Sequence, residues 1–385
     1  MDTIKVAKPQ VGEEEIEAVR EVLLSGRYVS GRRVEEFERA FAEYVGVKHV
    51  VAVNSGTAAL HAALDAGGVG PGDEVIVPAL TFFSTATAVL HQNAIPVFAD
   101  ISLDNYCIDP ADLERCVSPR TKAVIPVHYF GHAAEMDEIR AFARRRGLLV
   151  IEDCDQAHGT EYRGRKAGGL GDLGAFSFFA TKHMTTGEGG AVTTNNAEWA
   201  ERMRLFRSHG LRGRNDHVIL GYNYRMTEIA AAMGIVQLRR LDALNEGRIR
   251  NSEYLIRRLQ DIPWMTLPRV PDYVKHTYFW CHVLVDEETL GFATQELIQR
   301  LRDRGVEVRH RYIEPLYRQP LLTTHLPPML RLASAEGTIP DYASMQLPNV
   351  EASAGRLIGL PNRPDLRQPD LDKVVSSIRD IADGI

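Results

Sequence analysis

The fold of this chain is indicated most clearly by one stretch, Phe176-Ser177-Phe178-Phe179-Ala180-Thr181-Lys182-His183-Met184-Thr185-Thr186-Gly187-Glu188-Gly189-Gly190. It places one lysine, Lys182, between an apolar strand-like run and a second such run at Ala191–Thr194. Burying an ammonium group is costly, so lysines are rare between buried strands unless their chemistry is used. A lysine in a partly dry site loses its proton readily and becomes an amine nucleophile. Such an amine forms an imine with an aldehyde, and pyridoxal phosphate (PLP) is the commonest aldehyde cofactor.

A phosphate site is predicted where a β-branched run, Val50–Val53, ends in Asn54-Ser55-Gly56-Thr57 and a helical pattern follows. The start of a helix presents free N–H groups and the positive end of the helix dipole. Gly56 lets the backbone approach an anion, and Thr57 has a hydroxyl that donates or caps. The alternative is an ordinary capped turn, which is common in α/β folds.

A partner for the cofactor's ring nitrogen is predicted where the apolar run Leu148–Ile151 ends in acidic residues. Catalytic residues gather at the carboxyl ends of parallel strands. A carboxylate paired with the pyridine nitrogen keeps that nitrogen protonated, so Asp153 is the candidate. Gln156 follows three residues later and is a candidate donor to the ring oxygen. The alternative is that Asp153 or Asp155 caps the next helix.

An aromatic cover for the ring is predicted at Phe82 or Phe83, which follow the strand-like run Glu74–Val77. At least one of these two side chains is expected in the hydrophobic core.

The whole chain alternates strand-like and helical patterns, which predicts an α/β fold with a mainly parallel sheet covered by helices. A long helix is expected over 229–246, and the pattern changes after it. We therefore expect two domains, 1–245 with the N-terminal arm and the large PLP-binding domain, and 246–385 as a small C-terminal domain. The expected strands are Val50–Val53, Glu74–Val77, Pro96–Ala99, Ala123–Val127, Leu148–Ile151 and Ala175–Phe179.

Several ordered motifs together resemble the DegT/DnrJ/EryC1/StrS family of sugar aminotransferases. The resemblance covers nearly the whole chain and is strongest between Gly26 and Leu241. It implies fold type I: a large three-layer αβα domain with a mainly parallel sheet, and a smaller C-terminal α/β domain. The motifs are Arg27–Glu38, Ser55–Leu60, Pro78–Ala86, Ile151–Gly159, Phe176–Gly190 and Gly221–Ala232.

The resemblance also implies roles for single residues. Lys182 matches the lysine that forms the internal aldimine and later moves the proton, and Asp153 matches the partner of the pyridine nitrogen. Further cofactor contacts are implied at Gly56, Thr57, Phe82, Gln156, Ser177 and Asn223. Asn223 matches an asparagine that family members offer to the phosphate across a dimer interface, so a homodimer with shared active sites is implied.

The substrate side is expected to include two further segments. His183 follows the lysine, where the family often has asparagine, and Arg225 follows Asn223. In the segment 309–317, His310 or Arg311 takes the place of a histidine that the family often carries next to a tyrosine, here Tyr312. The physical alternative for this segment is a solvated basic turn.

The implied reaction is transamination, in which an amino group moves from glutamate or glutamine, through pyridoxamine phosphate, to a keto group of a sugar. We expect the sugar to be a nucleotide-linked 3-keto or 4-keto deoxysugar; a keto-cyclitol such as an inosose is the variant. A keto-sugar dehydratase on the same fold is a rival, but relatives of that type replace the lysine with histidine. A DNA-binding regulator is a second rival, and it lacks a basic helix face here.

Composition agrees with a large soluble enzyme. The 385 residues include 44% hydrophobic residues and carry a net charge of −6, which favours neither nucleic acid nor an acidic membrane as a partner. The cysteines form no C-x-x-C pair, and neither a signal peptide nor a membrane span is evident, so a cytoplasmic location is expected.

Two other motifs do not predict a binding site. The pattern Gly169-Leu170-Gly171-Asp172-Leu173-Gly174 precedes a strand instead of following one, which predicts a glycine turn and not a dinucleotide site. His128 and His132 with Glu135 are interrupted by Gly131, so no metal site is expected.

Overall fold

A seven-stranded sheet forms the centre of the molecule in the computed structural model, which describes residues 3–310, 314–335, 337 and 339–384. The strand order is β1-β9-β8-β5-β4-β2-β3, and β9 runs antiparallel to its neighbours while the remaining strands are parallel to one another. The bounds are β1 His49–Val53, β2 Glu74–Pro78, β3 Ile95–Ala99, β4 Thr121–Val124, β5 Leu149–Asp153, β8 Leu173–Ser177 and β9 Gly190–Thr194.

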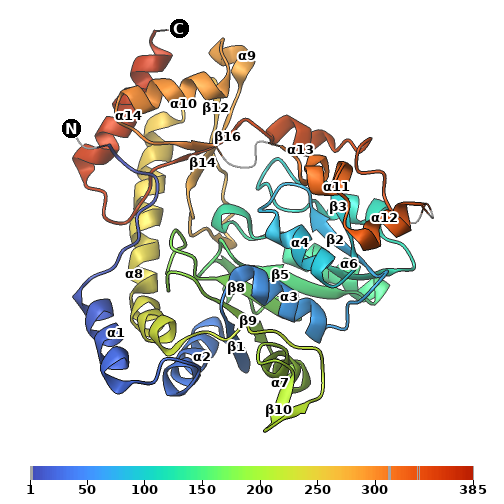
Figure 1. The fold of residues 1–385 in the computed structure, drawn as a ribbon. Helices are drawn as coiled ribbons and strands as arrows, with labels where there is room; N and C mark the ends of the chain where they lie inside the picture. Colours follow the sequence, from blue (N-terminus) through green and yellow to red (C-terminus); the bar gives the residue numbers. More distant parts are fainter. Residues whose placement is uncertain (1–2, 311–313, 336, 338, 385) are drawn as a thin grey trace.

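Both faces of this sheet are covered, because successive residues of a strand point to opposite sides. In β1, Val51 and Val53 belong to one apolar core, whereas Val50 and Ala52 belong to another. Helices α3 and α7 pack on the first face, and α2 and the first part of α8 pack on the second. The result is the three-layer arrangement seen in Figure 1, with the sheet between helical layers.

The helices around the sheet come from the first two thirds of the chain. Their bounds are α1 Glu13–Ser25, α2 Arg32–Val45, α3 Gly56–Ala66, α4 Ser84–His91, α5 Leu113–Cys116, α6 Met136–Arg146, α7 Ala197–Phe206 and α8 Glu228–Leu259. Short elements between them are η1 Pro110–Asp112, η2 Tyr129–Gly131, β6 Glu161–Tyr162, β7 Arg165–Lys166, β10 Leu211–Gly213, β11 Asp216–His217 and β13 Val274–Lys275.

A second, antiparallel sheet of order β12-β14-β16-β15 has its own apolar core. Leu255 and Leu259 at the end of α8 belong to that core, so the long helix α8 connects the two cores (Figure 1). The bounds are β12 Met265–Thr266, β14 Cys281–Val285, α9 Glu287–Leu290, α10 Thr294–Asp303, β15 Arg309–His310, β16 Leu357–Leu360 and α14 Gln368–Ala382.

The segment between β15 and β16 returns to the large sheet. Its residues Leu316, Tyr317, Leu322, Leu330 and Val350 belong to the apolar core of the large sheet. The elements there are η3 Leu316–Arg318, α11 Pro320–Thr323, α12 Pro328–Ala335 and α13 Pro348–Ser353. Residue 245, where we expect the domain boundary, lies inside α8, and the division at that residue stays a prediction.

The expected fold class is confirmed: the protein is an α/β chain with a large, mainly parallel, helix-covered sheet and a smaller C-terminal sheet with helices. Each of the six expected strands is present, with ends shifted by a few residues. The helix expected over 229–246 extends to Leu259, because a single continuous helix supports both cores. Within the described residues, no helix combines the length and apolar character needed to cross a membrane.

Helix α2 begins at a carboxylate that comes from a distant part of the chain. Glu228, the buried first residue of α8, accepts hydrogen bonds from the backbone N–H groups of Gly31, Arg33 and Val34 at 2.8, 3.0 and 3.0 Å. These N–H groups have no partner within their own helix turn, and an anion there also favours the helix dipole. Glu228 therefore joins the starts of α2 and α8.

We expect Glu228→Gln to lower the free energy of unfolding by about 2 kcal/mol, because one oxygen acceptor is replaced by an amide donor that opposes a backbone N–H. Urea denaturation measures the change. The control is Glu17→Gln, whose exposed pair with Arg20 should change the free energy by about 0.5 kcal/mol or less. Equal stabilities of the two variants would contradict the capping role.

Candidate active site

A pocket of about 370 Å³ lies where the parallel strands end. The carboxyl ends of β1, β2, β5 and β8 meet at this edge of the sheet, which is where α/β proteins place their ligand sites. The lining residues come from four separate segments of the chain: Ser55, Gly56, Thr57, Phe82, Ser84, Asp155, Gln156, Ser177, Phe179, Thr181, Lys182 and Glu188.

The predicted phosphate turn forms the start of α3. Ser55 is the N-cap, and its hydroxyl accepts a hydrogen bond from the Ala58 N–H at 3.1 Å. Gly56 and Thr57 are the first helical residues, and both line the pocket. A Cβ atom at Gly56 would lie 2.4 Å from Asp155 Oδ2 and 2.6 Å from Ser177 Cβ. This approach requires glycine at position 56 and brings Ser177, at the end of β8, beside the start of α3.

The strand β9 holds this turn in place from the other side. Gly190 pairs with both Val53 of β1 and Ser177 of β8. A Cβ atom at Gly190 would lie 2.3 Å from the Ser55 carbonyl oxygen, so glycine is required there too. The phosphate turn is therefore positioned by backbone pairing across three strands.

Asp153, the last residue of β5, is buried directly behind the pocket. Its Oδ2 accepts a hydrogen bond from the Thr85 hydroxyl at 2.8 Å, and its Oδ1 accepts one from the Asp155 N–H at 3.1 Å. Burial raises the pKa of Asp153, and these two donors with the charge of Lys182 act in the opposite direction. A protonated pyridine nitrogen opposite this carboxylate would further favour its ionised form.

Gln156 is oriented by an unusual backbone conformation. Its Oε1 accepts a hydrogen bond from the Phe130 N–H at 3.1 Å, which places the NH₂ end of the amide on the other side of the side chain. Phe130 has a φ of 52°, a left-handed value that is uncommon for a bulky residue. The residue that holds the Gln156 amide therefore has a backbone conformation of the kind that gathers at functional sites.

Lys182 follows β8 on a loop that is tied to the core at several points. The Phe178 N–H bonds the Gly189 carbonyl, and the Thr186 N–H bonds the Phe178 carbonyl, at 2.8 and 2.9 Å. The Nζ atom of Lys182 lies 5.2 Å from the centre of the Phe279 ring. The sequence brings a lysine to the carboxyl edge of the sheet, and the loop's own hydrogen bonds keep it there.

The two candidate aromatic residues are separated by the structure. Phe82 lines the pocket and is 55% exposed, which is unusual for so large an apolar side chain. Phe83 is partly buried and packs on the core of the large sheet. Phe82 is therefore the side chain in position to cover a flat ring.

The remaining expected residues do not line this pocket. Asn223 is exposed, and its carbonyl accepts a hydrogen bond from Asn54, so it lies near the phosphate turn of its own chain. The backbone of Arg225 forms an isolated antiparallel β-bridge with Val53 of β1. Their roles toward phosphate and substrate stay predictions.

His183 is buried, with its ring against His158 and Phe279, and burial lowers its pKa well below the usual value. This position does not favour the expected contact with substrate. His310 lies in β15 and its Nε2 contacts the Gly355 carbonyl. Arg311 and Tyr312 lie outside the described residues.

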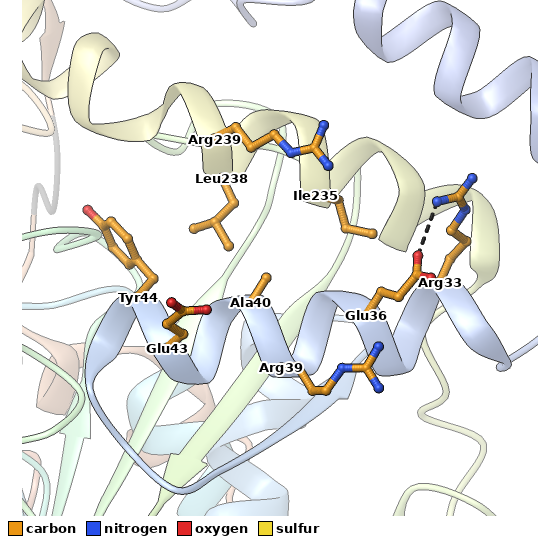
Figure 2. Close-up of a pocket in the computed structure, with 9 residues that line it drawn as sticks. All are labelled: Arg33, Glu36, Arg39, Ala40, Glu43, Tyr44, Ile235, Leu238 and Arg239. Carbon is orange, nitrogen blue, oxygen red and sulfur yellow. Dashed lines mark hydrogen bonds and ion pairs between the residues drawn. The ribbon is translucent and has the colours of Figure 1, made fainter.

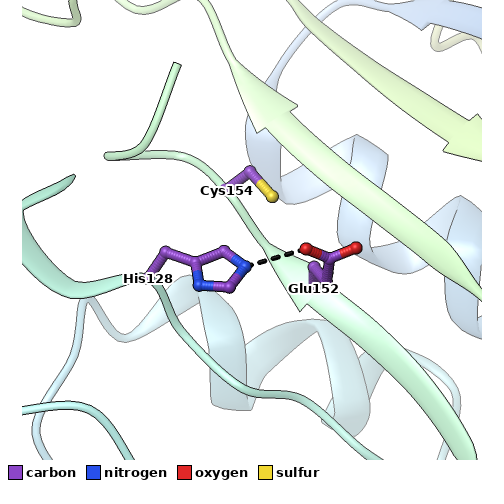
Figure 3. A group of neighbouring side chains, drawn as sticks. All are labelled: His128, Glu152 and Cys154. Atoms are coloured by element: carbon purple, nitrogen blue, oxygen red, sulfur yellow. Dashed lines mark hydrogen bonds and ion pairs between the residues drawn. The ribbon is translucent and has the colours of Figure 1, made fainter. Parts of the chain in front are cut away.

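A buried group of His128, Glu152 and Cys154 lies at the end of β5 (Figure 3). Glu152 and Asp153 are successive strand residues, so their side chains face opposite sides of the sheet. The N–H of Ala134 donates to His128 Nδ1, so His128 Nε2 carries the proton that is donated to Glu152. The Glu152 oxygens also accept the N–H groups of Gly168, Leu170 and Gly171 at 2.6–2.8 Å. These contacts account for the group as a hydrogen-bond network. The expected glycine turn is present over 169–172, and Leu173 and Gly174 already belong to β8.

A larger pocket of about 670 Å³ lies elsewhere, between α2 and α8 (Figure 2). Its sides carry Arg33, Arg39, Arg239, Glu36 and Glu43, and its base is apolar with Ala40, Ile235 and Leu238. It shares no residue with the pocket around Lys182, so its size does not mark it as the reactive site.

Two contacts of the site escaped the sequence analysis, which names a third residue, Asp155, only as a possible helix cap. Thr85 holds Asp153, Phe130 holds Gln156, and Asp155 lines the pocket as a second acid. Thr85 and Phe130 give no sequence signal for these contacts, which depend on how β2 and β4 lie beside β5. Asp155 carries a signal, because an acid two residues after a buried strand is uncommon unless it is used.

The residues present fit PLP. A helix start that only glycine can form would hold the phosphate, and a buried carboxylate would face the ring nitrogen. An exposed phenylalanine would cover the ring, and a pocket lysine would bind the aldehyde carbon.

Comparison with known proteins agrees with this geometry. The model of the DegT/DnrJ/EryC1/StrS aminotransferase family matches residues 9–379. The spore coat polysaccharide biosynthesis protein SpsC of Bacillus subtilis is 39% identical over 391 residues, which cover 98% of this chain and 96% of SpsC. GDP-perosamine synthase of Caulobacter vibrioides is 40% identical over 381 residues, which cover 97% of each chain.

The crystal structure of S. venezuelae DesV in complex with a ketimine intermediate matches with a TM-score of 0.88 and 35% identity. The match covers 97% of this chain and 95% of DesV. The fold, the pocket around Lys182 and the match along nearly the whole chain together assign this protein to the DegT/DnrJ/EryC1/StrS aminotransferase family, whose members are PLP-dependent enzymes.

Proposed function

We propose that this protein transfers an amino group from glutamate or glutamine to a keto group of a nucleotide-linked deoxysugar, with PLP bound at Lys182. The observation that carries the proposal is the pocket itself, in which one lysine, a helix start suited to phosphate and an exposed aromatic ring converge in front of a buried carboxylate. PLP, when bound, supplies an electron sink for the Cα–H bond of the amino acid.

The position of each pocket residue suggests its role toward the cofactor. Gly56, Thr57 and Ser177 would bind the phosphate with N–H and O–H donors. Asp153, held by Thr85, would keep the ring nitrogen protonated. Gln156 would donate its NH₂ to the ring oxygen, since its carbonyl is turned toward Phe130.

Lys182 would act as general base and acid. Its Nζ would take the proton from the Cα atom of the bound amino acid and give it to the cofactor's C4′ carbon, on the other side of the amino nitrogen. Proton transfer of this kind needs an amine that is neutral part of the time.

The sugar substrate is supported by the names of the relatives. GDP-perosamine synthase acts in amino-sugar formation, and SpsC is named for polysaccharide biosynthesis. Both match this chain over nearly its whole length. The nucleotide and the donor are the finer parts of the proposal, and a cytoplasmic location stays a prediction.

The first test is the visible absorbance of the protein with PLP, before and after glutamate or glutamine. We expect a band from the lysine-bound cofactor that bleaches with the donor. The mass of a nucleotide-linked keto-deoxysugar added afterwards should then change.

Lys182→Ala should lose the band while the far-ultraviolet circular dichroism is unchanged. Asp153→Ala should keep the band and lose about 10²–10³-fold in kcat, as for the loss of one preorganised electrostatic contact.

The control is Lys122→Ala, an exposed lysine of β4 that should keep both band and turnover. Transamination by purified Lys182→Ala, or an unchanged kcat in Asp153→Ala, would contradict the assigned roles. A bleached band without nitrogen transfer to any keto-sugar or keto-cyclitol would instead support dehydratase chemistry.

A second prediction concerns the phosphate turn. Gly56→Ala should weaken PLP binding by about 10–100-fold, the equivalent of about 1–3 kcal/mol of overpacking, because the new methyl group overlaps Asp155 and Ser177. Equilibrium dialysis measures the affinity. Gly213→Ala is the control, since a Cβ atom there meets open space. Equal affinities of the two variants would place the phosphate elsewhere.

We also propose a homodimer in which Asn223 reaches the partner's phosphate site. Exposed apolar side chains, among them Leu220 at 81%, and the exposed position of Asn223 support a partner surface. Light scattering should give the mass of two chains, and a mass of about 43.0 kDa for one chain would contradict the proposal.

A further inference from the structure

Asp155 is a second acid in the pocket, and no motif of the proposed reaction uses it. It lines the pocket, is buried, and lies against the first residue of α3. A Cβ atom placed on Gly56 would be 2.4 and 2.7 Å from the two carboxyl oxygens of Asp155, and 2.6 Å from Ser177 Cβ. The carboxyl group of Asp155 therefore lies against the start of α3, on the side of Gly56 where Ser177 also lies.

The carboxyl group of Asp155 is poorly compensated where it lies. Its Oδ1 is buried and has no hydrogen-bond partner among the described residues. Burial first, and then the nearby charge of Asp153, raise the pKa of Asp155 to about 8, although the charge of Lys182 acts in the opposite direction. Glu188 lines the same pocket from the loop before β9, whereas α3 and β8 present the uncharged residues Gly56, Thr57 and Ser177.

A phosphate bound at the start of α3 would meet this carboxyl group at short range. Two anions in contact within a protein repel each other strongly, so the ionised form of Asp155 opposes a phosphate dianion. A protonated carboxyl group is instead a hydrogen-bond donor, and O–H···O⁻ bonds to an anion are among the strong ones.

We propose that Asp155, in its protonated form, donates a hydrogen bond to the phosphate of the bound cofactor, so that the protein holds the phosphate less tightly as pH rises. This inference rests on the proposed function, because it requires PLP with its phosphate at the start of α3. The sign follows from the proton: binding is strongest below the pKa of free Asp155, about 8, and weakens above it. One coupled proton changes the dissociation constant by at most about tenfold per pH unit.

The test compares PLP with pyridoxal, which has the same aldehyde and ring but no phosphate. The full-length protein, freed of cofactor, is titrated with each ligand between about pH 7 and 9.5, where the free phosphate stays dianionic. The ratio of the two dissociation constants isolates the phosphate, because the titrations of Lys182 and Asp153 affect both ligands alike. For the wild type we expect the advantage of PLP over pyridoxal to fall by up to about tenfold per pH unit above pH 8.

Two variants test whether Asp155 causes the pH dependence of the ratio. Asp155→Asn has the same shape and cannot ionise, so its ratio should stay constant over this pH range. Glu188→Gln removes the other acid of the pocket and should keep the wild-type slope. Should Asp155→Asn fold poorly, Asp155→Ala replaces it and is expected to give a constant but smaller ratio.

The outcomes separate this inference from the proposed function. A wild-type protein that binds PLP at Lys182 but shows a constant ratio contradicts the role of Asp155 alone, as does an unchanged slope in Asp155→Asn. A wild-type protein that binds neither ligand overturns the proposed function and, with it, this inference.

Discussion

The site depends on the hydrogen bonds that the buried Glu152 carboxylate accepts. Its carboxylate is fully buried on the far side of β5 from the pocket, and it accepts hydrogen bonds from His128 and from three N–H groups of the 168–171 turn. An uncompensated carboxylate in this position would cost several kcal/mol, so the turn has to close around it. The turn leads directly into β8, which ends at Ser177, five residues before Lys182.

Alternation along β5 links this network to the chemistry. Glu152 and Asp153 are successive residues, so they face opposite sides of the sheet. On one side, Glu152 holds the hydrogen-bond network. On the other side, Asp153 contacts Thr85 next to the pocket. A one-residue shift of β5 would exchange the two acids, which is why the pairing of β5 with β4 and β8 matters for the position of the reactive carboxylate.

The pocket also shows how close packing and function constrain the same residues. Gly56 and Gly190 are required because α3, β1, β8 and β9 approach one another at the phosphate turn. The same approach brings Asp155 to this turn, so an acid lies where an anion is expected to bind. The proposed phosphate contact requires the acid to hold a proton, and burial and the nearby charge of Asp153 raise its pKa, although Lys182 acts in the opposite direction.

The sequence by itself determined the fold class, the order of the strands along the chain and the candidate residues Lys182, Asp153, Gly56, Thr57, Ser177, Gln156 and Phe82. Lys182, Asp153, Gly56, Thr57 and Gln156 follow from local patterns of apolar runs, small-residue turns and reactive side chains at strand ends, whereas Ser177 and the choice of Phe82 follow from the family resemblance. Only the tertiary structure decided that His183 is buried and that Thr85 and Phe130 are hydrogen-bonded to Asp153 and Gln156. It also decided that Leu316, Tyr317, Leu322, Leu330 and Val350 pack on the large sheet although they follow α10 of the second core. These features depend on which strands become neighbours and on which side chains fill the space between them, and neither is encoded in a local pattern.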